Sequence, residues 1–487
     1  MVFEQPHELD APSLDEYGAF LSAAARYCRS YASSGCCSTL YTNCEDRFLF
    51  ISSLPMKSNV SHSLTSCDDE PLPSILVGVD WGDSKHAFAL RLSDGTIESG
   101  FVASTSEILH SWLETLLMRF DSQPIAFVLE AGSVPLIAAL REYPQFRIYP
   151  VCPLASAAYR KSFRPSGAKD DQPDAQLLLQ MLVVNHHQLI PIPNQGSVET
   201  RLLDKLVIHR RRLVDRRTAL TNQLRSTLKA YFPQALQLLP DDLSRPFVAL
   251  FLERFPSLLD LKKARSSTIR KVFTKGGYRS AEKIEAKIQL IQQARLLHKD
   301  HALTAAAELQ VKHAIMEIKL LKRQISETET QVNQLFKNHE NASFYRNLPG
   351  AGPAMAPRLL AAIELLPTQT VSEAQRYIGV APVIERSGNQ CWTHRRFHPP
   401  GFLHQTLVEW AGLTVQYSQW ANAYYLHARA KGKKRYTILR ALAFKWVRII
   451  LRCLETSQGY DEATHIKRLQ QADVPWALPL LPQPSNT

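Results

Sequence analysis

The sequence contains no Cys-x-x-Cys pair, although it has eight cysteines. Five of them fall within the first 67 residues, at Cys28, Cys36, Cys37, Cys44 and Cys67. Structural zinc sites are built from cysteine and histidine ligands at short, regular spacings. The cysteine pattern therefore argues against a zinc site and favours ordinary reduced thiols.

Long apolar runs are also absent. No stretch reaches the roughly 18 consecutive apolar residues that a transmembrane helix requires. The opening segment, MVFEQPHELDAP, has no basic stretch followed by an apolar core, so a secretory signal peptide is not predicted. We therefore expect a cytoplasmic, bacterial-type, nucleoid-associated protein that does not bind membranes.

Acidic residues are outnumbered by basic ones. Lys and Arg total 57 against 45 Asp and Glu, which gives a formal net charge of +12. A basic excess raises the expectation of a nucleic-acid partner, although it does not identify a fold. Because 487 residues are too many for one hydrophobic core, about two to four domains are expected.

The first predicted domain boundary along the chain falls near residue 73. Residues 1–72 are rich in Ser and Cys and show one candidate helix, Asp15–Tyr31, so they predict a poorly ordered extension. Over residues 73–195 the pattern predicts three consecutive strands (75–80, 86–92, 96–104), followed by alternating helices (107–120, 135–141) and strands (124–132, 146–151). That order predicts an α/β domain with a mixed sheet, as in the ribonuclease H-like fold.

Four acids in this domain are candidate metal ligands. Asp80 and Glu130 end two apolar strands, and Asp171 and Asp174 lie three apart at the start of a helix. Clustered carboxylates repel one another unless cations neutralise them, and their oxygens suit Mg²⁺ or Mn²⁺. Two such ions can support phosphodiester cleavage. Each acid alone has a structural alternative, as a turn cap, a solvated strand end or a helix-start residue. The four together favour a metal site.

Residues 196–340 are predicted to be helical. A basic helix over 202–231 contains HRRRLVDRR, and heptad spacing runs from Val311 to Leu335. Apolar residues recur there at both a and d positions, which is typical of a coiled coil. Two arrangements satisfy the heptads: a dimer seam, or an intramolecular hairpin with the 202–231 helix. Periodicity does not separate them.

A C-terminal domain is predicted over 341–460, followed by a tail over 461–487. The turn at Gly350 and Gly352 precedes a helix and has two interpretations: a helix–hairpin–helix element that holds a phosphate, or a plain helix start. A loop-rich basic segment follows, and the last long helix is predicted over 436–454. Basic residues that precede this helix are candidate nucleic-acid contacts: Lys431, Lys433, Lys434 and Arg435.

The motifs resemble one known family when they are taken in order. VGVDWGDSKHAFAL, FVLEAG and AKDDQPDAQLL are similar to the three acid-bearing motifs of the DEDD insertion-sequence transposases, the family that includes the Piv DNA invertases. LPGAGPAMAPRLLAAI and YIGVAPVIERSGNQCW resemble that family's C-terminal transposase domain. The resemblance extends from about residue 74 into the C-terminal region.

This resemblance implies a RuvC-like N-terminal domain in which Asp80, Glu130, Asp171 and Asp174 hold Mg²⁺ or Mn²⁺. It also implies an essential serine in a Ser-Gly motif, which is Ser387 here, acting as a nucleophile on DNA. Characterised members pair with DNA through an element-encoded bridge RNA and act as tetramers. We therefore expect DNA, a guide RNA and a homo-oligomer (dimer or tetramer) as partners.

The residues around Ser387 add candidate DNA contacts. Arg386, Arg395 and Arg396 could hold the scissile phosphate, and His394 is a candidate proton shuttle. The family commonly follows its Ser-Gly motif with a Gly/Lys-rich segment, whereas this chain has FHPPGFLHQT. The resemblance therefore does not extend to the DNA contacts that follow the Ser-Gly motif.

The predicted function is that of a metal-dependent transposase or recombinase that breaks and rejoins DNA strands. Two alternatives remain. One is a RuvC-like structure-specific nuclease that uses only the four acids. The other is a catalytically inactive transposase relic that still binds nucleic acid.

Overall fold

The computed structural model describes residues 71–163, 170–192, 196–367, 370–396 and 399–480. The candidate helix Asp15–Tyr31 and nearly all of the predicted extension lie outside the described residues.

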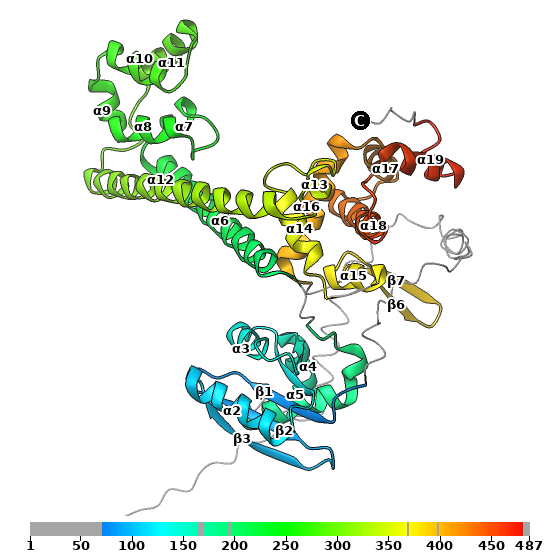
Figure 1. Ribbon diagram of the computed structural model, residues 1–487. Helices are drawn as coiled ribbons and strands as arrows, with labels where there is room; N and C mark the ends of the chain where they lie inside the picture. The colour runs from blue at the N-terminus through cyan, green and yellow to red at the C-terminus, as the bar shows by residue number, and fades with distance from the viewer. Residues whose placement is uncertain (1–70, 164–169, 193–195, 368–369, 397–398, 481–487) are drawn as a thin grey trace, which may run out of the picture. The chain divides into compact units, whose positions relative to one another are not determined.

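A five-stranded sheet forms the centre of the N-terminal domain, with strand order β3-β2-β1-β4-β5 (Figure 1). The strands are β1 (Ile75–Asp80), β2 (Lys85–Arg91), β3 (Ile97–Ala103), β4 (Ile125–Glu130) and β5 (Phe146–Val151). β1 pairs antiparallel with β2 and parallel with β4, while β2–β3 is antiparallel and β4–β5 is parallel. The predicted mixed sheet and ribonuclease H-like α/β fold are confirmed.

Helices cover both faces of this sheet. Their bounds are α2 (Ser106–Arg119), α3 (Val134–Leu140), α4 (Pro153–Phe163) and α5 (Asp171–Asn185), and a short 3-10 turn, η2 (His186–Gln188), follows α5. Val77 and Phe127 share one buried cluster with Leu113 of α2. Leu76 and Val128 share the other with α5. Alternate residues of β1 and β4 point to opposite faces of the sheet, and helices bury both faces. The sequences of these strands are therefore continuously apolar.

Gly78 allows α5 to lie directly against β1. A Cβ atom added at Gly78 would come 2.3 Å from the carbonyl oxygen of Ala175 and 2.7 Å from the amide nitrogen of Leu179. Only a residue without a side chain permits this approach of helix backbone to strand backbone. The contact fixes the first turn of α5 close to the carboxyl end of β1.

Two long helices, α6 (Val198–Tyr231) and α12 (His301–Asn338), pack antiparallel against each other. Leu203 near the start of α6 shares a buried cluster with Phe336 near the end of α12, whereas Leu228 shares one with Val311. The heptad positions of α12 are therefore buried within the chain. Of the two arrangements that the heptads allow, the structure has the intramolecular hairpin.

A small helical subdomain joins the two long helices. It comprises α7 (Gln234–Leu238), α8 (Pro246–Arg254), α9 (Leu258–Lys263), α10 (Ser266–Lys275) and α11 (Ala281–Gln293). Its core is aromatic, with Phe251 and Phe273 fully buried at a ring-centroid distance of 5.8 Å.

The C-terminal domain is mainly helical, as predicted. It contains α13 (Ala342–Arg346), α14 (Ala356–Glu364), α15 (Val371–Ile378), α16 (Gly401–Tyr417), α17 (Gln419–Ala430), α18 (Arg435–Glu455), α19 (Glu462–Gln471) and one hairpin of β6 (Val383–Ser387) and β7 (Gln390–His394). Three buried tryptophans, Trp410, Trp420 and Trp446, form the centre of its core. None of the described helices, here or earlier in the chain, is long and apolar enough to cross a membrane.

One feature of this domain differs from the sequence prediction, and the structure bears on a second feature that the sequence left open. The segment predicted as a tail from residue 461 includes α19, whose Ile466 is 1% exposed within the domain core. The turn at Gly350, for which two interpretations were open, packs against α16: a Cβ atom at Gly350 would lie 3.1 Å from the Leu413 side chain, and Trp410 Nε1 donates to the Pro349 carbonyl at 3.0 Å. These contacts favour the plain helix-start interpretation of Gly350.

Candidate active site

Asp80 and Glu130 end adjacent parallel strands. Val79 pairs with Leu129 in the β1–β4 register, so the acid that follows each residue stands at the same edge of the sheet. Residues two apart along a strand point to the same face. Asp80 therefore follows Gly78, and Glu130 follows Val128, onto the face that α5 covers.

The first turn of α5 brings a third carboxylate to this edge. Asp174 immediately precedes Ala175, whose carbonyl lies against Gly78. Asp174 is 2% exposed, whereas Asp171, three residues earlier, is exposed. The two helix acids thus have different surroundings, although both lie in the first turn. Asp170 is the N-cap residue, and its side chain makes no capping hydrogen bond.

Asp174 is held by an arginine of α4. Arg160 Nε donates to Asp174 Oδ1 at 2.8 Å, and the two side chains are 19% and 3% exposed. The other carboxylate oxygen, Oδ2, is buried and has no hydrogen-bond partner among the described residues. A buried carboxylate oxygen without a partner is unfavourable, so this atom has capacity for a further ligand.

Glu130 is held by the same helix. The buried Ser156 hydroxyl donates to Glu130 Oε1 at 2.5 Å. Sequence reasoning identified the acids but neither α4 partner. The available signal was the position of this helix, which follows β5, is the last element before the Asp171 motif and carries the basic pair Arg160 and Lys161.

The donor set fits a hard divalent cation, because carboxylate oxygens are the ligands that Mg²⁺ and Mn²⁺ prefer. The partnerless Oδ2 of Asp174 is the atom that such an ion would satisfy. With the side chains as they stand, no three His, Cys, Asp or Glu residues of the described ranges are grouped closely enough to hold an ion. Asp174 and Glu130 bond to Arg160 and Ser156 in this arrangement.

Ser387 lies at the turn of the β6–β7 hairpin, within the segment predicted to be loop-rich. It pairs with Gln390 across a two-residue turn, and Gly388 in that turn has φ +56°. Tight hairpins require a positive φ at this position, and glycine adopts it without steric cost. The Ser-Gly motif therefore places an exposed hydroxyl beside the tip of a hairpin.

His394 and Glu385 lie in contact on this hairpin, with Nε2 and Oε2 2.8 Å apart. The strand register places both on the face that also carries Ser387. Arg386 and Arg395 are exposed and Arg396 is partly buried, with its Nε atom lacking a hydrogen-bond partner in the described part of the chain. Hydroxyl, imidazole and guanidinium groups therefore occur together on one short segment.

Comparison with known proteins places both regions in one family. Residues 77–233, which contain all four acids, match a DEDD transposase model of the IS110 type, and residues 342–426, which contain Ser387, match the model described as transposase, IS116/IS110/IS902 family. The chain belongs to the IS110 family of DEDD transposases. Membership implies DNA binding and the cleavage and transfer of DNA strands.

Two similar proteins support the assignment of the chain to the IS110 family. A mini-circle transposase for IS117 from Streptomyces coelicolor is 26% identical over 408 residues, which are 82% of this chain and 98% of the relative. The transposase y4uE from Sinorhizobium fredii is 26% identical over 201 residues, which are 40% of this chain and 55% of the relative.

Arg395, which directly follows the hairpin of the transposase, interacts electrostatically with Arg440 of α18 and His404 of α16. The pKa of the Arg440 guanidinium on α18 is lowered by burial and further by the nearby charge of Arg395. Burial is also the main cause that lowers the pKa of His404, to which Arg440 and Arg395 add. An anion placed among these basic groups would interact favourably with them.

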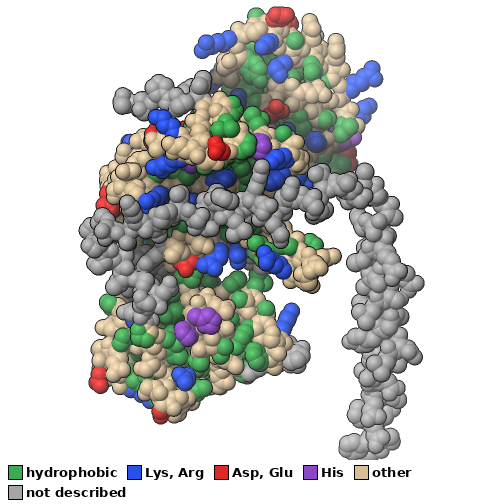
Figure 2. Space-filling model, turned by 90° about the vertical axis from the view of Figure 1, so that its right-hand side faces the viewer, with side chains coloured by type: hydrophobic (Ala, Val, Ile, Leu, Met, Phe, Trp, Pro, Cys, Tyr) green, Lys and Arg blue, Asp and Glu red, His purple; other side chains and the backbone are tan. Residues whose placement is uncertain are grey.

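Further basic residues lie at the turn between α17 and α18. Lys431, Lys433, Lys434 and Arg435 are all exposed, as a contact with a phosphate backbone requires. In the space-filling view, Lys and Arg side chains are spread over the visible face, and Asp and Glu side chains are few (Figure 2).

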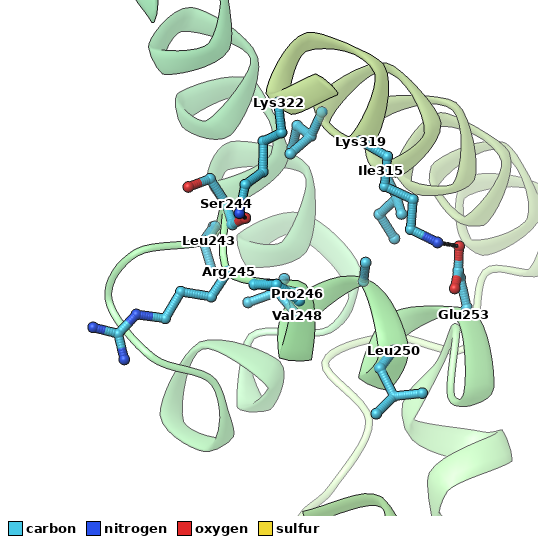
Figure 3. A pocket seen from close by; sticks show the side chains of 12 residues that line it. Leu243, Ser244, Arg245, Pro246, Val248, Leu250, Glu253, Ile315, Lys319 and Lys322 are labelled. Atoms are coloured by element: carbon cyan, nitrogen blue, oxygen red, sulfur yellow. Dashed lines mark hydrogen bonds and ion pairs between the residues drawn. The ribbon is translucent and has the colours of Figure 1, made fainter. Parts of the chain in front are cut away.

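A cavity of about 340 Å³ lies elsewhere in the transposase, between α8 and α12 (Figure 3). Leu250, Ile315 and other apolar residues line it, and Lys319 pairs with Glu253 at its side. Its lining includes none of the four acids and does not include Ser387, so it does not belong to the candidate active site.

Proposed function

We propose that this IS110-family transposase recombines DNA with two groups of residues: the acids Asp80, Glu130, Asp171 and Asp174, which bind Mg²⁺ or Mn²⁺, and the serine nucleophile Ser387. The observation that carries the proposal is the arrangement of Asp80, Glu130 and Asp174. All three stand at one edge and on one face of the sheet, and one buried carboxylate oxygen has no partner.

A divalent cation bound by these carboxylates would act as a Lewis acid on a phosphodiester oxygen. The chain's own residues prepare that position. Gly78 fixes α5 against β1, which sets the depth of Asp174. Ser156 orients the Glu130 carboxylate, and Asp171, being exposed, is free to move towards a ligand.

Ser387 would supply the nucleophile for strand exchange. Its oxygen attacks the phosphorus atom, a Ser387–phosphate ester forms, and the P–O bond to the sugar breaks. The proton leaves Ser387, and the departing sugar oxygen takes one up. Attack by a second DNA hydroxyl reverses these steps and rejoins the strands. Arg386, Arg395 and Arg396 would bind the phosphate, and Glu385 would orient His394 as the proton carrier.

The remaining parts of the proposal concern partners. The exposed basic turn from Lys431 to Arg435 would bind nucleic-acid backbone. A guide RNA would supply sequence recognition, because base pairing relieves the protein of reading bases. Assembly into a dimer or tetramer would allow the acids of one protomer to act with Ser387 of another.

The proposal is tested by measuring circle formation from a donor element with Mg²⁺ and RNA transcribed from the element's flanks. Wild type is compared with Asp171→Asn, Asp174→Asn and Ser387→Ala. Matched controls are Asp83→Asn, which removes an exposed acid just beyond β1, and Ser326→Ala, which removes an exposed hydroxyl on α12. We expect activity to fall at least ~100-fold in the three site variants and to be unchanged in the controls.

Each result bears on a different part of the proposal. Full recombination by Ser387→Ala would refute the serine nucleophile, and cleavage without rejoining would favour the RuvC-like nuclease. Full activity of both aspartate variants would refute the metal site. Wild-type activity that persists after ribonuclease treatment would exclude the guide. An inactive wild type that still binds DNA would indicate a relic.

A further inference from the structure

The buried carboxylate of Asp174 has a cation beside it in this structure, and that cation is Arg160. The contact is a single hydrogen bond of 2.8 Å from Nε to Oδ1, between side chains that are 19% and 3% exposed. A carboxylate this deeply buried requires an opposite charge, because an unpaired buried charge is strongly unfavourable.

Arg160 does not satisfy the whole carboxylate of Asp174. Arg160 binds one oxygen of Asp174, whereas bidentate arginine–carboxylate pairs bind both. The second oxygen stays buried without a partner among the described residues. Arg160 also comes from α4, a different helix from the acid it neutralises. The guanidinium can therefore withdraw without moving the backbone of α5.

We propose that Arg160 is an internal counter-ion that neutralises Asp174 while the metal site is empty and leaves Asp174 when a divalent cation binds. This inference rests on the proposed metal site. Arg160 and the incoming cation compete for the same carboxylate, so the arginine lowers metal affinity while it preserves the fold of the empty site. Arg160 is thus a positioning residue that sets the metal dependence of the domain.

Calorimetric titration of the full-length protein with Mn²⁺ alone tests this competition. Removing the charge in Arg160→Gln is expected to tighten Mn²⁺ binding about tenfold, because the cation no longer displaces a guanidinium. The matched control is Arg119→Gln, which removes an arginine from an exposed ion pair with Glu98 in the same domain. The Arg119→Gln variant is expected to bind Mn²⁺ with wild-type affinity.

Hydrogen exchange of the α5 segment gives a readout independent of activity. Without metal, Arg160→Gln leaves Asp174 charged, buried and unpaired, so α5 amides should exchange at least ~10-fold faster than in wild type. Saturating Mn²⁺ should restore wild-type protection, because ligand binding stabilises the folded form. Asp174→Asn, which has no charge to neutralise, should show neither the loss of protection nor the rescue by Mn²⁺.

A third measurement uses only the wild-type chain, in case Arg160→Gln does not fold. The rate at which an arginine-specific dicarbonyl reagent modifies Arg160 should rise when Mn²⁺ is added, since the guanidinium is released. The rate at Arg119 should not change.

The outcomes distinguish this inference from the proposed function. If wild type does not bind Mn²⁺, or Asp174→Asn binds it equally well, the metal site fails and the inference fails with it. If wild type binds Mn²⁺ and Asp174→Asn does not, the metal site stands. In that case, unchanged or weaker Mn²⁺ binding by Arg160→Gln, or a modification rate at Arg160 that Mn²⁺ does not raise, overturns the counter-ion role alone.

Discussion

Replacing Gly78 with alanine should displace the α5 helix and with it the candidate metal site. The added Cβ atom would lie 2.3 Å from the carbonyl oxygen of Ala175 and 2.7 Å from the amide nitrogen of Leu179. Both atoms belong to helix backbone, so no side-chain rotation relieves the clash. The helix must move more than ~1 Å away from β1 to reach ordinary contact distances.

The energetic cost follows from what α5 buries. Leu178, Leu179 and Leu182 are each 2% exposed or less against the sheet, and a shift of this size weakens their contacts along the whole interface. Overpacking of cores typically costs 1–3 kcal/mol, and a clash with backbone belongs at the upper end. We therefore expect ~3 kcal/mol of destabilisation, on the order of 100-fold in the local opening equilibrium.

Hydrogen-exchange mass spectrometry of peptides from β1 and α5 is the appropriate assay, because it reports on this domain within a multi-domain chain. The matched control is Gly132→Ala, two residues beyond Glu130, where an added Cβ atom meets nothing within 4 Å. That variant should exchange like wild type. If Gly78→Ala exchanges no faster than Gly132→Ala, α5 does not rest on β1 as described, and the placement of Asp174 loses its physical basis.

Three further predictions concern the helical regions. Asp300 caps α12 by accepting from the amides of Ala302 and Leu303, so Asp300→Ala should cost ~1 kcal/mol, measured by urea denaturation against wild type. Glu409 neutralises the buried Arg358 at 2.9 Å, so Glu409→Ala should lower stability by ~2 kcal/mol, whereas an exposed-pair variant such as Glu285→Ala should change it little. Burial, with the charges of Lys445 and Arg468 adding to it, lowers the pKa of His465 from 6.5 to about 4. The unfolded chain therefore takes up a proton that the folded chain resists. Stability is fully present above pH 6.5 and falls as the pH drops towards 4, by ~2 kcal/mol at pH 5. His465→Gln should remove this part of the pH dependence of the urea midpoint, and an unchanged profile would contradict the assignment.

The sequence was sufficient to predict the N-terminal fold and the position of its acids. Apolar runs that stop at Asp80 and Glu130 identify strand ends. The carboxyl ends of parallel strands meet at a common edge, and β1 and β4 are parallel. The alternation of helices and strands then restricts the topology to a few arrangements. The partners of the acids were not predictable, because Arg160 and Ser156 reach them through tertiary packing of α4.

The hairpin that carries Ser387 shows a different limit. A glycine after Ser387 is compatible with a turn. The flanking strands are short and exposed, so they have no buried face and no apolar alternation that would predict them. The structure forms them by cross-strand backbone pairing. Tertiary contacts also join the predicted tail to the C-terminal core, since Ile466 is buried there and Glu462 accepts a hydrogen bond from the Ser418 hydroxyl.

Periodicity therefore determined which face of each segment is buried, whereas tertiary structure decided what covers it. The heptads of α12 required an apolar partner and were equally compatible with a second chain or with α6. The subdomain between α6 and α12 returns the chain antiparallel, so α6 is that partner. The hydrophobic effect is non-directional, so an apolar face is stabilised by any apolar surface that covers it. The pairing of α6 with α12 was therefore decided by the tertiary structure, and so was the pairing of Arg160 with Asp174.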